Sequence, residues 1–369
     1  MADVIVIGGG GSGLAAAVEA GSDGARVVVL EKNTQLGGTT GIAVGSLTAA
    51  CTSFQAAAGI QDSPSEHDED MAKFAAEREQ FNNAPLRRLL AEQAAETLEW
   101  LMGLGVEFVG PNPEPPNRVP RMHNVVPNAK AYIAALHRAA LRYGVEIRVG
   151  CAAKRLIQDA QGRVVGMEAE DDAGRSLTFQ ATKGVVLAAG DYSNGYDIKR
   201  QFLPESIASI EGINPLCTGD GHRMGMEVGA ALANMHLVFG PQIRFVQPPK
   251  PPFAQMLPTS PVLAKIMART YDLLPRAVTR HIMKSLLVTW QHPEDTLFQK
   301  GAILVNREGR RFVDELRQPE LVIPRQPGKE AFVLMDNRVA QVFSAFPNFI
   351  STAPDIAYAY LDDYRRLRQ

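Results

Sequence analysis

The sequence predicts an α/β fold, and three observations lead to this class. A short β-rich apolar run at residues 3–7 is followed by the glycine run 8–13 and by a helix of small residues, 14–20. A second apolar run, 26–30, completes a strand–helix–strand unit of the kind that builds parallel sheets. The 369 residues are enough for one large domain or for two.

The composition excludes several classes of protein. Hydrophobic residues make up 46% and charged residues 21%, so the chain is not a disordered one. A net charge of −2 gives no single-sign field for nucleic acid or an anionic membrane. The three cysteines lie far apart, which excludes a disulfide scaffold and a thiolate zinc cage, and we expect no metal. No signal peptide or apolar run of bilayer length is visible, so we expect a cytoplasmic protein with no membrane segment.

The later elements follow from periodicity and turn residues. Leucine spacing and flanking glycines predict helices at about 65–79, 83–103, 129–143 and 219–230. Apolar runs joined by turns predict a β-meander and one further strand, at 145–149, 154–158, 163–169, 176–180 and 184–188. The composition changes sharply at 247–253, which predicts a domain 1–246 and a second domain 247–369. In the second domain we expect a helix within 261–287 and strands at 302–306 and 311–313.

The glycine run matches the pattern G-x-G-x-x-G through Gly8, Gly10 and Gly13. Gly8 makes the tight turn, Gly10 lets a pyrophosphate approach the backbone, and Gly13 lets the helix pack on the strand. The helix N-terminus offers free N–H groups and a positive dipole end to the phosphates. Glu31 ends the second strand, where an acidic side chain accepts hydrogen bonds from ribose hydroxyls. The motif therefore predicts a dinucleotide site.

The segment after Glu31 favours FAD over NAD. Glycines and hydroxyl residues recur in Gly37-Gly38-Thr39-Thr40 and again in Ala43-Val44-Gly45-Ser46. A simple NAD domain would continue here into another strand–helix unit. Glycines and hydroxyls instead suit a long extended ligand whose phosphates and flavin both need close backbone approach.

Several separated segments resemble the flavoprotein subunits of the fumarate reductase and succinate dehydrogenase superfamily, nearest to the soluble fumarate reductases. Besides the two glycine segments, they are 49–63, 185–190 with Asn194, 218–221 and 301–315. The resemblance implies a Rossmann-like FAD-binding domain of the glutathione reductase type, with a β-meander, plus an α+β cap domain. It implies noncovalent FAD, because no histidine lies in the loop 37–46.

By that resemblance, a set of residues would line the cofactor from its adenosine end to its flavin. The adenosine end falls to Glu31, Lys32 and Ala153, and the pyrophosphate to Gly8, Gly10, Ser12 and Gly13. The path to the flavin and the remaining wall fall to Gly38, Thr39, Thr40, Ala43, Gly45, Ser46, Ala189, Gly190 and Asp220.

The family transfers a hydride between the flavin and a carbon next to an activating carbonyl. The resemblance therefore implies an FAD-dependent oxidoreductase that acts on a C–C or C=C bond of a small molecule. The family's acid is an arginine shortly after an R-F-V-x-E segment, but Pro319 stands at the equivalent position here. Arg317 lies two residues earlier, and we favour an exposed surface arginine. His123 is left undetermined, and no catalytic residue is assigned.

Two alternatives stay open. The family's C-terminal return into the FAD domain is not found, so we expect an incomplete cap domain. The chain would then be a partial or non-catalytic flavoprotein subunit, and a second polypeptide would complete its FAD site. The other alternative is a 3-ketosteroid dehydrogenase-like enzyme, although Arg317-Gln318 stand where that enzyme's tyrosine is expected.

Overall fold

The computed structural model describes residues 1–246, 256–271, 273–274, 292–352 and 358–362. Contacts divide the chain into two compact units, each assembled from several parts of the sequence. Unit 1 comprises residues 1–43, 101–106 and 129–238, and unit 2 comprises 44–100, 107–128 and 239–369. The boundary predicted at 247–253 lies wholly outside the described residues.

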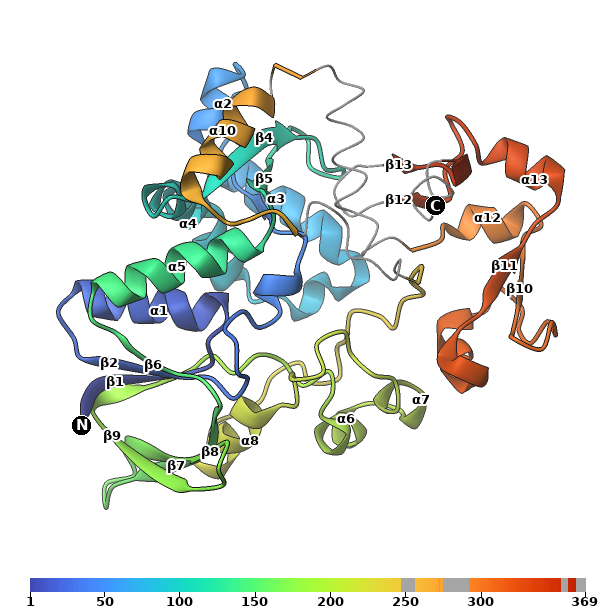
Figure 1. Ribbon diagram of the computed structural model, residues 1–369. Coiled ribbons are helices and arrows are strands. Elements are labelled where there is room, and N and C mark those ends of the chain that lie inside the picture. Colours follow the sequence, from blue (N-terminus) through green and yellow to red (C-terminus); the bar gives the residue numbers. More distant parts are fainter. Residues whose placement is uncertain (247–255, 272, 275–291, 353–357, 363–369) are drawn as a thin grey trace. The chain divides into compact units, whose positions relative to one another are not determined.

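Unit 1 contains a six-stranded sheet with the order β6-β2-β1-β9-β8-β7 (Figure 1). Its strands are β1 (Ala2–Ile7), β2 (Val27–Leu30), β6 (Glu146–Arg148), β7 (Cys151–Gln158), β8 (Val164–Asp171) and β9 (Ser176–Leu187). The strands β1, β2 and β6 run parallel, and β7, β8 and β9 form an antiparallel meander. Helix α1 (Gly11–Ser22) packs against β2 and against α5 (Lys130–Arg142). The predicted α/β fold is confirmed.

Strand β9 differs from the prediction, which placed two strands at 176–180 and 184–188. The structure has one continuous strand that pairs with β8 through Ser176–Gln180 and with β1 through Ala181–Leu187. The residues between the two runs, Ala181, Thr182 and Lys183, carry no turn signal that would end a strand. A single strand therefore joins the meander to the parallel part of the sheet.

The carboxyl end of β9 leads to short helices within unit 1. They are α6 (Tyr196–Phe202), α7 (Glu205–Ala208) and α8 (Asp220–Glu227), and the 3-10 helix η1 (Thr40–Ile42) follows β2. Helix α8 packs on β7, and its Met224 belongs to the core that also holds Ile5, Ile7 and Leu30.

Unit 2 contains a three-stranded antiparallel sheet of β3 (Ser46–Thr48), β5 (Met122–Val126) and β4 (Glu107–Asn112). Helix α10 (Pro261–Tyr271) contacts both β4 and β5. The other helices before residue 104 are α2 (Ser53–Ala57), α3 (Pro64–Ala75), the 3-10 helix η2 (Ala76–Phe81) and α4 (Ala84–Gly103). The rest of the helix predicted within 261–287 lies almost wholly outside the described residues.

The later part of unit 2 packs around the fully buried Phe343. It comprises α12 (Asp295–Gln299), β10 (Ile303–Val305), the 3-10 helices η4 (Pro319–Leu321), η5 (Ile323–Arg325) and η6 (Pro327–Lys329), β11 (Phe332–Leu334), α13 (Asn337–Val342), β12 (Ser351–Thr352) and β13 (Tyr358–Ala359).

The strand predicted at 311–313 is wrong. Only an isolated bridge joins Val305 to Arg311, and β10 pairs with β11 instead. The Glu315 carboxylate accepts the N–H of Leu304 at 2.8 Å. This backbone donor of β10 is therefore bonded to a side chain and is not available to a strand at 311–313.

None of the described helices has the length and apolar character needed to cross a bilayer.

Candidate functional site

The glycine turn lies between β1 and α1, and its three motif glycines meet different surroundings. A methyl group at Gly8 would lie 2.2 Å from the Ala188 carbonyl oxygen, and one at Gly13 would lie 1.9 Å from the Gly8 carbonyl oxygen. A methyl group at Gly10 would meet nothing closer than 3.8 Å. Packing thus requires Gly8 and Gly13, whereas space is left open beside Gly10. Because α1 has no acidic residue in its first turn, its positive end is free to attract an anion.

The predicted second glycine segment packs directly on this turn. The N–H of Gly37 donates to the Gly9 carbonyl at 3.0 Å, and Gly11 donates its N–H to Thr40 Oγ1 at 3.3 Å. At Gly38 φ is +52°, and a methyl group there would lie 3.2 Å from the Gly10 Cα. The structure therefore brings the predicted residues Gly38 and Thr40 against the glycine turn that leads into α1, next to the predicted pyrophosphate residue Gly10.

The predicted adenosine end surrounds a cavity at the carboxyl ends of β1 and β2. Six of the residues predicted for FAD line this cavity, namely Gly8, Glu31, Lys32, Ala153, Ala189 and Asp220. Apolar side chains, including Leu30 and Met224, complete its wall. A mixed wall of this kind suits an aromatic base on its apolar side and a sugar on its polar side.

Glu31 is buried, and both of its carboxylate oxygens accept backbone hydrogen bonds. Its Oε2 accepts the N–H of Gly9 at 2.7 Å, and its Oε1 accepts the N–H of Asn33 at 2.8 Å. Each carboxylate oxygen can accept more than one hydrogen bond, so Glu31 keeps acceptor capacity for ribose hydroxyls. The same side chain ties the glycine turn to the end of β2.

Lys32 and Asp220 meet on the wall of the cavity, with Nζ and Oδ2 2.8 Å apart. Thr218 joins them, because its Oγ1 accepts from Lys32 at 2.8 Å and donates to Asp220 Oδ1 at 2.9 Å. Burial alone would raise the pKa of Asp220, but the hydrogen bonds from Lys32 and Thr218 outweigh it and lower the pKa below its usual value. Asp220 thus stays ionised and fixes the Lys32 ammonium.

Thr39 and Ala43 of the predicted flavin path and Gly190 of the predicted remaining wall lie in unit 1. The side-chain amide of Asn214 donates to Thr39 Oγ1 at 3.1 Å, and Cys217 Sγ lies 3.5 Å from the same oxygen. Cys217 Sγ would also lie 3.3 Å from a methyl group at Gly190, where φ is +82°. The N–H of Ala43 donates to the Thr40 carbonyl and ends η1.

Sequence reasoning missed Asn214, Cys217 and Thr218, although all three lie just before the Gly219-Asp220-Gly221 segment. Their signal was weak, because asparagine and threonine before glycine are also common in plain turns.

Gly45 and Ser46 belong to unit 2. Ser46 begins β3, and its Oγ donates to Asn124 Oδ1 at 2.8 Å across the pairing with β5. Ser12 is exposed on the first turn of α1 in unit 1.

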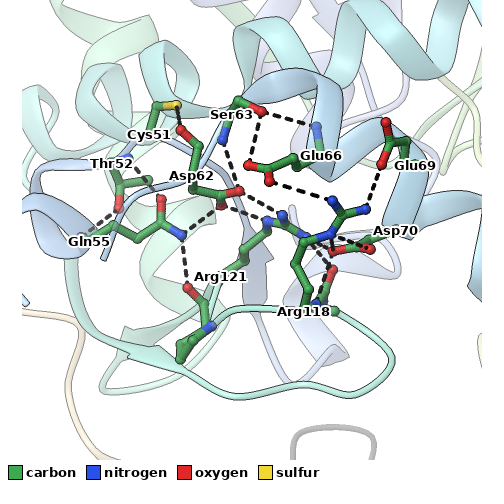
Figure 2. Close-up of polar contacts among 12 residues, drawn as sticks. Cys51, Thr52, Gln55, Asp62, Ser63, Glu66, Glu69, Asp70, Arg118 and Arg121 are labelled. Carbon is green, nitrogen blue, oxygen red and sulfur yellow. Dashed lines mark hydrogen bonds and ion pairs between the residues drawn. The ribbon is translucent and has the colours of Figure 1, made fainter. Parts of the chain in front are cut away.

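A buried ion-pair network lies next to this sheet in unit 2 (Figure 2). The Arg121 guanidinium is fully buried and pairs with Asp62 at 2.6 Å and with Asp70 at 2.5 Å. Arg118 donates to the same Asp70, and Gln55 donates to Asp62 Oδ2 and to the Pro120 carbonyl, each at 2.8 Å. The network joins α2 and α3 to the proline-rich connection that precedes β5.

The undetermined His123 and the expected surface residue Arg317 have defined surroundings. His123 is fully buried, with Nε2 3.0 Å from Thr52 Oγ1 and Nδ1 3.3 Å from the Leu47 carbonyl, and burial lowers its pKa. Arg317 has a side chain that is 86% exposed and pairs with Asp314 at 3.3 Å. Pro319, at the position of the family's acid, is buried. Within the described ranges, no group of three His, Cys, Asp or Glu side chains could hold a metal ion.

Comparison with known proteins adds the deciding observation. The model of a protein family described as "FAD binding domain" matches residues 3–248, which is more than half of the chain. The chain belongs to the FAD binding domain family. FAD is its cofactor, as the sequence predicted. The open space beside Gly10 is chemically suited to a phosphate, and the mixed polar and apolar lining at Glu31 to a base with its sugar.

Relatives of this FAD-binding chain are reductases. It is 25% identical to "Fumarate reductase (cytochrome)" of Shewanella frigidimarina, over 94% of this chain and 54% of the relative. It is 28% identical to "Urocanate reductase" of Eggerthella lenta, over 87% of this chain and 47% of the relative. The predicted family of fumarate reductase-like flavoproteins is confirmed. The FAD-binding chain spans about half the length of these curated relatives.

A solved structure shows the same fold. The open conformation of a flavocytochrome c3 fumarate reductase superposes with a TM-score of 0.67 at 24% identity, covering 92% of this chain and 54% of that one. The predicted fold, an FAD-binding domain with a cap, is therefore confirmed.

Proposed function

We propose that the chain is an FAD-dependent oxidoreductase that adds hydrogen across a C=C bond, or removes it from a C–C single bond, next to a carbonyl or carboxylate. The proposal rests on the cofactor cavity together with relatives that are reductases of fumarate and urocanate. FAD supplies the two-electron hydride donor or acceptor when it is bound. The chain's own residues would hold it noncovalently, since no histidine lies in the loop 37–46.

We propose that the predicted residues divide this task. Gly10 and the first turn of α1 would receive the pyrophosphate, and Glu31 would accept hydrogen bonds from the ribose. Lys32, Asp220, Ala153 and Ala189 would surround the adenosine. Gly38, Thr39, Thr40, Ala43, Gly190, and Gly45 with Ser46 in unit 2, would approach the remainder of the cofactor.

Fumarate itself is not the proposed substrate. The buried Pro319 occupies the position at which the family has its catalytic acid, and the nearby Arg317 is exposed and paired with Asp314.

A panel of substrates is therefore the direct test: the chain, with its flavin reduced by dithionite without oxygen, is offered enoic acids, cyclic enones and steroid enones. Reoxidation of the flavin absorbance by at least one class is the expected result. If none reoxidises the flavin faster than buffer does, the oxidoreductase proposal fails.

A second candidate is a flavoprotein part that is completed by another polypeptide. The observation that favours it is coverage of only about half the length of the relatives. The test is to measure FAD binding of the chain alone and after pull-down of partners from its native cell extract. FAD retained only in the presence of a second polypeptide would support this candidate, and tight FAD binding by the chain alone would exclude it.

We further propose a cytoplasmic location, which suits three free thiols in a reducing compartment.

A further inference from the structure

The loop 214–220 in unit 1 contacts residues at both predicted ends of the cofactor. Thr218 and Asp220 bind Lys32 at the adenosine end, as described above. At the other end, Asn214 and Cys217 contact Thr39, which the flavin path requires. Asn214 and Cys217 are both buried, whereas Thr39 is exposed.

The orientation of the Asn214 amide is fixed by the chain itself. Its Oδ1 accepts the backbone N–H of Leu216 at 3.1 Å, and a backbone N–H can only donate. The other end of the amide, Nδ2, must therefore be the atom that faces Thr39 Oγ1, at 3.1 Å. Because Nδ2 can only donate, the Thr39 hydroxyl oxygen is held as an acceptor.

A further layer holds Asn214 in place. The Asn194 amide donates to the carbonyl of Asn214 at 2.7 Å and to that of Gly212 at 3.1 Å. The Gly212 N–H returns a hydrogen bond to Asn194 Oδ1 at 3.0 Å. The buried Lys199 ammonium donates to the carbonyls of Ser193 and Ile210 on either side of these contacts. The loop that carries Asn214 is thus fixed by the partly buried Asn194 and the buried Lys199.

A hydroxyl group that accepts one hydrogen bond still has its own hydrogen to donate. For Thr39 the described neighbour that could take this hydrogen is Cys217 Sγ, at 3.5 Å, and sulfur is a weak acceptor. A phosphate or flavin carbonyl oxygen is a stronger acceptor. We propose that Asn214 is a positioning residue that turns the Thr39 hydroxyl into a hydrogen-bond donor toward FAD. This role rests on the proposed placement of Thr39 in the cofactor site.

The variant Asn214→Asp tests the direction of that hydrogen bond. An aspartate keeps an oxygen for the Leu216 N–H, so the loop contact is retained, but it offers Thr39 an acceptor instead of a donor. The Thr39 hydrogen would then turn toward Asp and away from FAD. The matched control is Leu216→Asp, which adds the same charge to the same loop without a contact to Thr39. We expect Asn214→Asp to raise the dissociation constant of FAD about tenfold beyond that of the control.

A double-mutant cycle separates positioning from general damage to the loop. Asn214→Ala and Thr39→Val should each raise the dissociation constant of FAD about tenfold over the wild type. The double variant should also raise it by no more than about tenfold, because both changes remove the same hydrogen bond to FAD. FAD affinity is measured by quenching of its fluorescence, and melting of the apo chain shows that each variant is folded. Thr39→Ser should restore binding, because it keeps the hydroxyl.

The outcomes are distinct. Wild-type affinity in Asn214→Asp, or losses in the double variant that multiply to about a hundredfold, would overturn the positioning role while leaving the proposed function intact. A wild-type chain that binds no FAD would overturn both. A chain that binds FAD with the expected pattern but reduces no substrate would overturn the proposed function alone.

Discussion

Two glycines of one turn differ in what a methyl group would meet. At Gly13 it would overlap the Gly8 carbonyl, whereas at Gly10, where φ is −83°, it would project into open space. We expect Gly13→Ala to lower the free energy of unfolding of the apo chain by about 1–3 kcal/mol. Gly10→Ala should change it by at most about 0.5 kcal/mol.

FAD affinity should distinguish the two variants differently from stability: Gly10→Ala, which hardly changes stability, should weaken FAD binding. Gly10→Ala fills the space that the pyrophosphate needs, so it should weaken FAD binding tenfold or more in a chain that stays folded. Urea unfolding and FAD titration of both variants measure the difference. Equal FAD affinity of Gly10→Ala and the wild type would place the pyrophosphate elsewhere.

A pH effect is expected from His67 in α3. This residue is 2% exposed, and its Nδ1 has no hydrogen-bond partner within the described part of the chain. Burial, with the nearby Arg121, lowers its pKa below the ordinary 6.5, although Asp62, Asp68 and Asp70 oppose this. As the pH falls, His67 of the unfolded chain takes up a proton before His67 of the folded chain does. The contribution of the neutral, buried His67 to the free energy of unfolding is therefore present above pH 6.5, and it is lost as the pH falls through the folded pKa.

The variant His67→Gln removes the titrating group. The free energy of unfolding of the wild type should decline more steeply with falling pH below 6.5 than that of the variant. Parallel curves for the two proteins, measured by urea unfolding at a series of pH values, would contradict the assignment.

At the scale of single residues, the sequence predicts where the glycine turn and Glu31 lie in the fold, because local spacing determines their positions. It does not find Asn214 or the partners of Lys32, since these contacts join residues more than 170 positions apart. Thr39 was assigned to the flavin path by resemblance, but the amide that orients its hydroxyl becomes visible only in three dimensions.

Among the elements, α3 and the connection before β5 are joined by buried charges. Replacing Arg121 with leucine would leave the buried Asp62 without its cation and would remove one of the cations that pair with the buried Asp70 (Figure 2). We expect a loss of about 3–5 kcal/mol in the free energy of unfolding. The control is Arg155→Leu on the meander, whose pair with Glu168 is exposed and should contribute no more than about 1 kcal/mol. Similar losses for the two variants would contradict this view of the network.

Elements with strong periodicity were predicted with nearly correct bounds, as α1, α4 and α5 show. The prediction errors occur where pairing between residues far apart in the sequence determines which segments form strands. The partner of β10 is β11, some thirty residues away, and not the adjacent run 311–313. Short strands such as β3 and β5 have no clear alternation and depend on each other for pairing.

For the whole chain, bound FAD should act as a stabiliser. A ligand that binds only the folded state at a hundred times its dissociation constant adds about 2.7 kcal/mol to the free energy of unfolding. The melting temperature should therefore rise with FAD concentration, whereas riboflavin, which lacks the pyrophosphate and adenosine, should have a much smaller effect. An equal rise with riboflavin would show that the adenosine cavity and the α1 turn do not contribute to binding.

Strand β9 has a consequence for how the protein is made. β1, at residues 2–7, lies between β2 and β9, and its parallel register with β9 extends to Leu187. During synthesis, β1 leaves the ribosome before β9 and cannot complete its pairing until residue 187 has emerged. Closing so long a stretch of chain costs entropy and slows folding. The cofactor turn that follows β1 should therefore form late, and a nascent chain stopped before residue 187 should not retain FAD.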